Sequence, residues 1–313
     1  MVEAWYPPSV GSAEARLRYY AQRFDTVEAD SPFYGIPAVS TTQHWAQRTP
    51  AGFVFHVKAY GLMTGHSVEE RSLPPDLRGG GYRVSARGRV FDADERTVEG
   101  AFTAFSEAVA PLRATGKLGG ILMQYPPSMR ALDSAEELAG LNRIAHDREL
   151  LGSDRMLVEF RHASWVGDPQ RQGRVMRVLA DLGAAYVSVD APRVGDASAM
   201  PPVAAVTAPV AYVRLHGRNA ATWGLRTGSA SDRFDYLYER SELQEWAAPL
   251  ESMAQEAETT FAMFNNCRYD YAPRNARELA EIIGEDARRP DGSLPGEAGG
   301  EQAPHQGELE FET

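Results

Sequence analysis

The chain has 313 residues, of which 43% are hydrophobic, and a formal net charge of −11. This apolar content suffices for one domain with a large core, while the negative charge disfavours, without excluding, a nucleic-acid partner. No apolar run approaches the ~20 residues that span a bilayer, and Met1 is not followed by a secretion signal. The single cysteine, Cys267, rules out an internal disulfide framework, so we expect a protein of the reducing cytoplasm.

Short β-branched and aromatic runs with polar ends alternate with segments of helical periodicity. The predicted strands are residues 24–30, 53–58, 120–124, 156–159, 185–190, 211–216 and 260–266. The predicted helices are residues 12–23, 41–48, 97–114, 134–148, 170–183, 240–257 and 274–284. This alternation predicts a parallel sheet with helices outside it, and the polar strand ends favour a (β/α)8 TIM barrel with its site at the C-terminal mouth. We expect residues 1–284 to form this barrel.

Residues 285–313 form an acidic tail with eight acidic residues and two arginines, and their composition is typical of disorder. Within the tail, Gln306, Leu309 and Phe311 have the spacing of the short peptide by which bacterial repair and replication proteins dock on the sliding clamp. An extended segment would place the two apolar side chains in a pocket while the glutamine bonds at its edge. The alternative is a chance match.

Long connections follow several strands. Residues 60–96 are either a lid or binding loop, or a surface insertion. Residues 191–209 and 217–235 are predicted to be loops. In the strand at 53–58, alternation places Val54, His56 and Lys58 on one face, which we expect to look into the barrel, and the phenylalanines beneath the helices.

Charged residues gather at the predicted strand ends, where a buried core has no need of them. Glu159 and Arg161 share one face of their strand, and Arg214 and His216 share a face of another. We predict that Glu28, Lys58, Glu159, Arg161 and Arg214 converge at one barrel mouth. The alternative is a purely structural lattice of ion pairs.

Several motifs occur in a fixed order along the chain. They are Ser31-Pro32-Phe33-Tyr34, Phe53-Val54-Phe55-His56-Val57-Lys58, Gln124-Tyr125-Pro126-Pro127, Glu159-Phe160-Arg161-His162-x-Ser164-Trp165, Tyr212-Val213-Arg214-Leu215-His216 and Phe264-Asn265-Asn266. Together they resemble the domain-of-unknown-function 72 family, also called YecE-like. The resemblance covers roughly residues 5–284 and implies a TIM barrel, without implying an established general activity.

The chain departs from the family pattern in two places. The family's first strand precedes a Trp-x-x-x-Tyr-Pro segment, but here Trp5-Tyr6-Pro7 already matches that segment. We therefore expect a barrel without its first strand, or a start codon placed too late. A glycine between Thr64 and His66 leaves the role of this histidine open.

Three hypotheses for function remain open. The first is an enzyme that hydrolyses or isomerises a phosphorylated or carboxylated small molecule, because arginine and lysine bind such anions and a nearby glutamate or histidine transfers protons. Its predicted catalytic residues are Glu28, Lys58, Glu159, Arg161 and His216. Its predicted substrate-binding residues are Tyr34, His56, Gln124, His162, Trp165, Arg214, Asn265 and Asn266.

The second hypothesis is a metal-dependent phosphodiester hydrolase acting on nucleic acid in DNA repair. Its candidate ligands are His56, His162, His216, Glu28, Glu159 and Asp190, but no metal-binding spacing of histidines is present. The sequence requires no cofactor, although a divalent metal is compatible with it. The third hypothesis is a non-catalytic binding protein. Cys267 lacks an adjacent base and is expected to pack rather than react.

Overall fold

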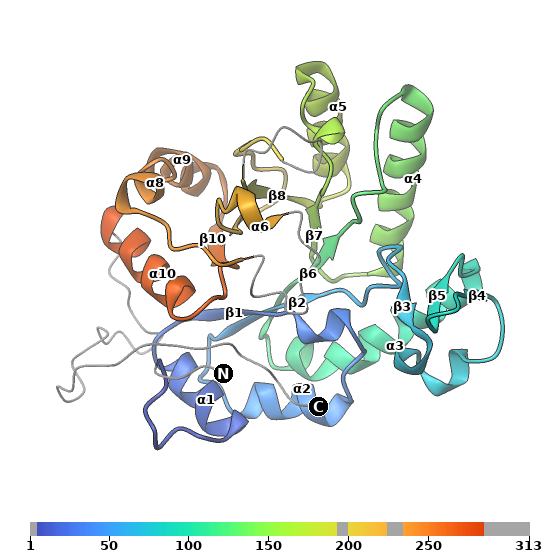
Figure 1. Cartoon of the computed structure of the whole chain (residues 1–313), viewed down its shortest axis with the longest axis horizontal. Coiled ribbons are helices and arrows are strands. Elements are labelled where there is room, and N and C mark those ends of the chain that lie inside the picture. Colours follow the sequence, from blue (N-terminus) through green and yellow to red (C-terminus); the bar gives the residue numbers. More distant parts are fainter. Residues whose placement is uncertain (1–4, 193–199, 224–233, 285–313) are drawn as a thin grey trace.

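The computed structural model describes residues 5–192, 200–223 and 234–284. Seven parallel strands form a barrel-like sheet with helices around it (Figure 1). In sheet order, the strands are β1 (Thr26–Ala29), β2 (Val54–Lys58), β6 (Leu118–Gln124), β7 (Met156–Glu159), β8 (Ala185–Asp190), β9 (Val210–Leu215) and β10 (Thr259–Phe264). The predicted tail, including Gln306, Leu309 and Phe311, lies outside the described residues.

The helices among the described residues are α1 (Ala13–Ala21), α2 (Val39–Gln47), α3 (Glu95–Ala114), α4 (Ser134–Leu150), α5 (Pro169–Asp181), α6 (Ala220–Trp223), α8 (Arg240–Gln244), α9 (Ala247–Glu256) and α10 (Tyr271–Ile282). Helix α1 precedes β1 and α10 follows β10, while the other helices lie in the connections between consecutive strands of the barrel. Figure 1 shows α1 to α3 on one side, α4 and α5 on another, and α8 to α10 on a third. No helix in the described part of the chain is both long and apolar enough to cross a membrane.

The barrel is nearly closed, with β1 and β10 at the two ends of the sheet order. Residues 5–10 contain no strand, as expected for a barrel that lacks its first strand. Inside the barrel, His56 on β2, the neighbour of β1, contacts Phe261 on β10, with ring centroids 4.4 Å apart. Side chains thus complete the interior where backbone pairing between β1 and β10 is absent from the described sheet.

Strand β2 shows how alternation positions the site. Phe55 points outward and stacks on Trp45 of α2 with a centroid distance of 5.8 Å, and Phe53 packs near Tyr20 from the end of α1. His56, from the other face, lies in the barrel interior. Lys58 shares that face and ends the strand, so its side chain reaches the C-terminal mouth.

The long connection after β2 is folded rather than structureless. It contains the antiparallel strands β3 (Val68–Glu69), β4 (Arg83–Val84) and β5 (Arg89–Phe91), in the order β3-β5-β4. It also contains two short 3-10 helices, Glu70–Ser72 and Pro75–Leu77. Buried side chains at Val68, Leu73 and Val90 anchor this small sheet to the main core.

Two predicted helix boundaries were wrong. Helix α2 begins at Val39 rather than at a Thr41 or Thr42 cap, and Thr42 instead donates its hydroxyl hydrogen to the carbonyl of Ala108 at 2.5 Å. The helix predicted at 240–257 is two helices, α8 and α9, separated at Glu245 and Trp246.

Candidate functional site at the barrel mouth

Arg214, on β9, is the centre of a charged cluster at the C-terminal end of the strands, and its side chain is fully buried. Its Nη1 donates to Glu159 Oε2 on β7 at 2.5 Å. Its Nε donates to Glu28 Oε2 on β1 at 3.0 Å, and its Nη2 donates to Glu28 Oε1. Tyr212 Oη also donates to Glu28 Oε2, at 2.9 Å. The guanidinium therefore links three strands across the barrel interior.

Glu159 accepts hydrogen bonds from three neighbouring side chains, one of which is Arg214. Its Oε1 accepts from Gln124 Nε2 at 2.9 Å and lies 3.1 Å from His216 Nε2. Arg161 Nη1 is 3.5 Å from the same oxygen. Asn265 Nδ2 lies 3.0 Å from His216 Nδ1, and because an amide N–H donates, Nδ1 accepts and Nε2 carries the hydrogen that reaches Glu159.

Lys58 forms the other side of the mouth. Its Nζ is 3.3 Å from Asp30 Oδ1 and lies 4.5 Å above the ring centroid of Phe33. His66 packs edge-on against Phe33 at 4.9 Å, and its Nδ1 is 2.8 Å from the hydroxyl of Thr64. The sequence left the role of His66 open, and the structure places it beside the cations of the mouth.

Aromatic side chains from the connection after β9 cover the buried histidine. The ring of His216 lies 5.7 Å from that of Phe234 and 6.1 Å from that of Trp223, measured between centroids. The guanidinium of Arg161 lies 5.1 Å from the ring centroid of Trp223. The sequence analysis missed Trp223 and Phe234 because it predicted residues 217–235 to be a loop, whereas Trp223 ends the four-residue helix α6, which is too short to show periodicity in the sequence.

The two glutamates around Arg214 have pKa values displaced in opposite directions. Burial raises the pKa of Glu28, and the neighbouring Asp30 carboxylate adds to that effect against the opposing charge of Arg214. Burial alone would also raise the pKa of Glu159, but Arg214, His216 and Arg161 together hold that pKa well below the usual value. Burial lowers the pKa of His216 to about 4, so its ring is neutral near pH 7. Carboxylates whose pKa values are displaced in opposite directions are typical of acid–base sites.

The structure brings eight of the thirteen residues singled out from sequence into this cluster and places two more in the loops that follow β1 and β7. The eight are Glu28, Lys58, Glu159, Arg161, His216, Gln124, Arg214 and Asn265, and the other two are Tyr34 and His162. Tyr34 is 66% exposed and packs edge-on against Phe33, with ring centroids 5.2 Å apart. His162 caps the 3-10 helix Ala163–Trp165, where its Nδ1 accepts from Ser164 N at 3.2 Å.

Trp165 and Asn266 face away from the mouth. Trp165 is fully buried, stacks on Phe160 at a centroid distance of 4.6 Å, and donates from Nε1 to the carbonyl of Met129 at 2.8 Å. Asn266 Nδ2 donates to the carbonyl of Tyr236 and to Asn275 Oδ1, both at 2.9 Å. In this conformation, both side chains stabilise the fold and have no surface to offer a ligand.

His56 lies deeper in the barrel than the cluster. It is fully buried between Tyr212 and Phe261, with ring centroids at 4.8 and 4.4 Å. Neither ring nitrogen has a hydrogen-bond partner in the described part of the chain. Burial lowers its pKa to about 3, so the ring is a neutral packing element of the interior.

Asp190, a candidate metal ligand from sequence, has both carboxylate oxygens occupied by protein donors. Oδ1 accepts from Tyr238 Oη at 2.8 Å, and Oδ2 accepts from Trp246 Nε1 at 2.8 Å. Arg218 donates to both oxygens, with its Nη2 2.7 Å from Oδ2. Asp190 therefore fastens α9 and the preceding loop to the barrel.

A nearly closed parallel barrel with a charged cluster at its C-terminal mouth defines the class as a TIM-barrel-like protein. The family model described as "Protein of unknown function DUF72" matches residues 1–299, and the chain belongs to this family. It is similar to UPF0759 protein YunF of Bacillus subtilis, at 29% identity over 281 residues covering 89% of each chain.

Two solved structures share the fold. A DUF72 family protein from Enterococcus faecalis is 26% identical, with a TM-score of 0.68, covering 87% of this chain and 95% of that one. A DUF72 family protein from Thermotoga maritima is 24% identical, with a TM-score of 0.67, covering 90% and 93%.

Proposed function

We propose that the protein is an enzyme whose barrel mouth transfers a proton to or from a small anionic substrate, in an isomerisation or a hydrolysis. The observation that carries this proposal is the pair of glutamates on either side of Arg214, with the pKa of Glu28 raised and that of Glu159 lowered. A raised pKa makes a carboxylate a better general base near neutral pH.

Glu28 is the proposed general base. Its side chain retains 9% exposure, whereas Glu159 and His216 have no exposed side-chain surface. Its Oε2 accepts from both Tyr212 and Arg214, whereas among the described residues its Oε1 accepts only from Arg214. Since a carboxylate oxygen has two lone pairs, Oε1 has room for a substrate proton. Glu159 and His216 then act as positioning residues that hold Arg214.

Lys58 and Arg161 are the proposed anion-binding residues. Their side chains are 12% and 15% exposed, so both reach the mouth while their stems remain buried. Arginine binds phosphate or carboxylate with two parallel hydrogen bonds, and lysine adds a point charge. A substrate anion would compete with Asp30 for Lys58, and the partial exposure of Asp30 leaves it room to withdraw.

A purely structural ion-pair network would explain why Arg214 is buried with Glu28 and Glu159. It does not explain why further ionisable groups, Lys58 and Arg161, border this network where the strands end. A network built for stability alone would gain little from two further cations whose charged ends reach the mouth. This asymmetry supports a ligand site over a purely structural network, and the opposed pKa shifts of Glu28 and Glu159 favour an enzyme over a non-catalytic binding protein.

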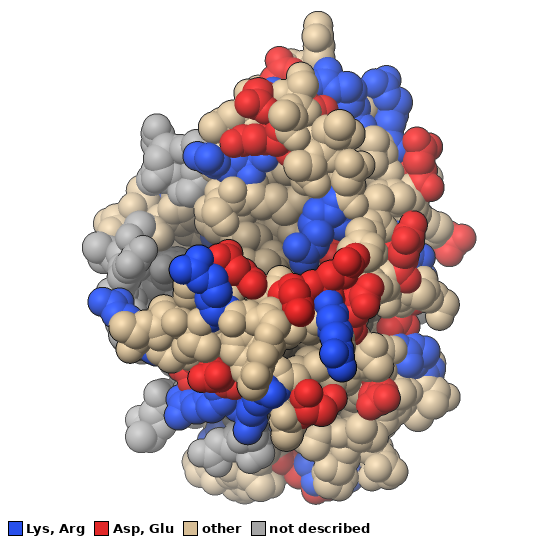
Figure 2. Space-filling model, turned by 90° about the vertical axis from the view of Figure 1, so that its right-hand side faces the viewer, with Lys and Arg blue, Asp and Glu red and all other residues tan. Residues whose placement is uncertain are grey.

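The geometry gives less support to a metal-dependent nuclease at the mouth. Arg214 occupies the space between Glu28 and Glu159, where its positive charge would repel a metal ion. Acidic and basic side chains are interspersed on the face drawn in Figure 2, instead of forming the continuous basic surface that a nucleic-acid backbone prefers. Sliding-clamp docking through Gln306, Leu309 and Phe311 stays a separate sequence prediction.

The test is a screen of the full chain against phosphorylated and carboxylated metabolites, beside a short DNA panel, with and without divalent metal. Glu28→Gln should lower turnover of a hit by about 10²–10⁴-fold, the usual contribution of a general base, while leaving its binding nearly unchanged. Lys58→Met and Arg161→Met should instead weaken binding. His44→Gln, on the exposed surface of α2, is the control. Unchanged turnover in Glu28→Gln would overturn the assignment.

A further inference from the structure

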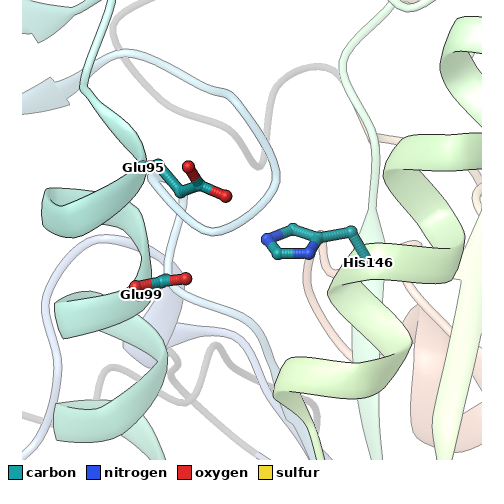
Figure 3. Close-up of side chains that lie close together, drawn as sticks. All are labelled: Glu95, Glu99 and His146. Atoms are coloured by element: carbon teal, nitrogen blue, oxygen red, sulfur yellow. The ribbon is translucent and has the colours of Figure 1, made fainter.

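A second cluster of ionisable side chains lies outside the barrel, between α3 and α4. Glu95 and Glu99 are one turn apart on α3, and Figure 3 shows both carboxylates on the side of α3 that faces the ring of His146 on α4. One ligand atom from each of the three residues lies within 4.8 Å of the other two. We propose that these residues bind a divalent transition-metal ion, such as Zn²⁺, that joins the two helices.

The donor set fits such an ion. Imidazole nitrogen and carboxylate oxygen bind Zn²⁺ at about 2.0–2.2 Å, which puts neighbouring donors roughly 3.5 Å apart in a tetrahedral complex. The present separations, within 4.8 Å, need only small side-chain rotations to reach this geometry. Both glutamates are exposed and His146 is half-buried, so the side chains are free to rotate. Water would complete the coordination.

The ligand atoms of the three side chains are not engaged by other described residues, so they are available to a cation. Among the described residues, most buried or half-buried acids pair with an arginine, as Glu137 does with Arg171 and Arg174, whereas Glu95 and Glu99 are exposed. In the described residues, no ion pair or side-chain hydrogen bond is found for Glu95, Glu99 or His146. Two like charges at i and i+4 repel each other, and a metal ion would remove that repulsion. The helix dipole favours an acid at Glu95 but does not explain why His146 faces it.

The helices leave space beside the cluster. A hollow of about 420 Å³ is lined by Glu99, Phe102, Thr103, Ser106 and Glu107 of α3 and by Leu150 of α4. A metal ion at the end of this hollow would fix the spacing of the two helices without filling it. His146 precedes Asp147, which accepts from Tyr125 Oη at 2.9 Å just beyond β6. The ion would thus stabilise a helix that is bonded directly to the barrel.

The test uses the full chain, stripped of metal by a chelator and dialysed. Titration with Co²⁺, followed by its visible absorption, and with Zn²⁺ by calorimetry should show one saturable site per chain and a higher melting temperature. His146→Gln and Glu99→Gln should each weaken binding at least tenfold. Glu107→Gln, which lines the hollow outside the cluster, and His44→Gln should bind as the parent chain does.

Two results would overturn the proposal. One is the lack of any saturable binding by the parent chain. The other is binding that survives His146→Gln but is lost in Glu159→Gln, because this would place the metal at the barrel mouth. Far-ultraviolet circular dichroism of each variant checks that the chain is folded, so that a loss of binding is not mistaken for a loss of structure.

Discussion

Arg214 and Glu159 form an ion pair of 2.5 Å in which neither side chain has exposed surface. Removing two charges from water costs several kcal/mol per ion, and only close pairing with further hydrogen bonds offsets that cost. Here Glu28, on the other side of Arg214, and His216, beside Glu159, supply the additional contacts. The pair is therefore one part of a network whose members depend on each other.

Replacing Arg214 should destabilise the protein strongly. Arg214→Met leaves Glu28 and Glu159 buried without their cation, and we expect the free energy of unfolding to fall by about 3–5 kcal/mol. Arg240→Met is the matched control, because Arg240 is 53% exposed and its 3.4 Å pair with Glu278 should contribute less than about 1 kcal/mol. Urea denaturation at pH 7 measures both. Equal losses in the two variants would contradict the buried network.

The stabilising effect of Glu159 should disappear in acid. Its pKa is lowered in the folded chain, so the unfolded chain binds more protons and stability rises with pH across the window below the ordinary value of about 4.3. Glu159→Gln should therefore cost most at neutral pH, and the difference from the parent should shrink as the pH falls below that value. Denaturation curves between pH 3 and pH 7 test this. A constant difference would show that the carboxylate charge is not what matters.

His56 should be a source of acid sensitivity. Its folded-state pKa of about 3 lies below the unfolded value of about 6.5, so the folded chain binds fewer protons and loses stability as the pH falls between these values. His56→Leu removes this penalty and two ring nitrogens without hydrogen-bond partners in the described structure. As the pH falls from 6.5 to about 3, the free energy of unfolding of the variant should rise relative to that of the parent by about 1.4 kcal/mol per pH unit. If the free energies of unfolding of the two chains change in parallel with pH, the predicted role of His56 is wrong.

The ring of Trp165 should leave no room for a side chain at Gly140. A Cβ at Gly140 would lie 2.4 Å from Cη2 of the buried indole, so Gly140→Ala should lower stability by about 1–3 kcal/mol. Gly173, on α5, has nothing within 4 Å of its Cβ position, and Gly173→Ala should be neutral or stabilising by up to about 1 kcal/mol. Thermal unfolding compares them. A harmless alanine at 140 would mean that Trp165 is free to move.

Periodicity in the sequence predicted the barrel because local patterns determine most of its elements. The strand expected at 53–58 is β2, Val54–Lys58, and the helix expected at 134–148 is α4, Ser134–Leu150. The errors have tertiary causes. Thr42 is not a cap because its hydroxyl bonds to Ala108, 66 residues away, and the break between α8 and α9 lies at Trp246, which donates to Asp190.

Strand parity also placed Glu28, Glu159 and Arg214 in one cluster, but it carried no information on depth. Both His56 and Lys58 face inward, yet only Lys58 reaches the mouth, because it is two residues nearer the strand end. Trp165 belongs to the same sequence motif as Glu159, but it lies in a 3-10 helix that directs its ring into the core. Depth and direction depend on the whole barrel, which no local pattern encodes.

The most direct test of the acid–base site is a pH titration of the Glu28 and Glu159 carboxyl carbons by ¹³C nuclear magnetic resonance. Signals are assigned by their loss in Glu28→Gln and Glu159→Gln. We expect the Glu28 signal to titrate above the usual pKa of a glutamate and the Glu159 signal to stay ionised well below it. Titration of both carboxyls near the usual value, or in the opposite order, would contradict the proposed division of roles.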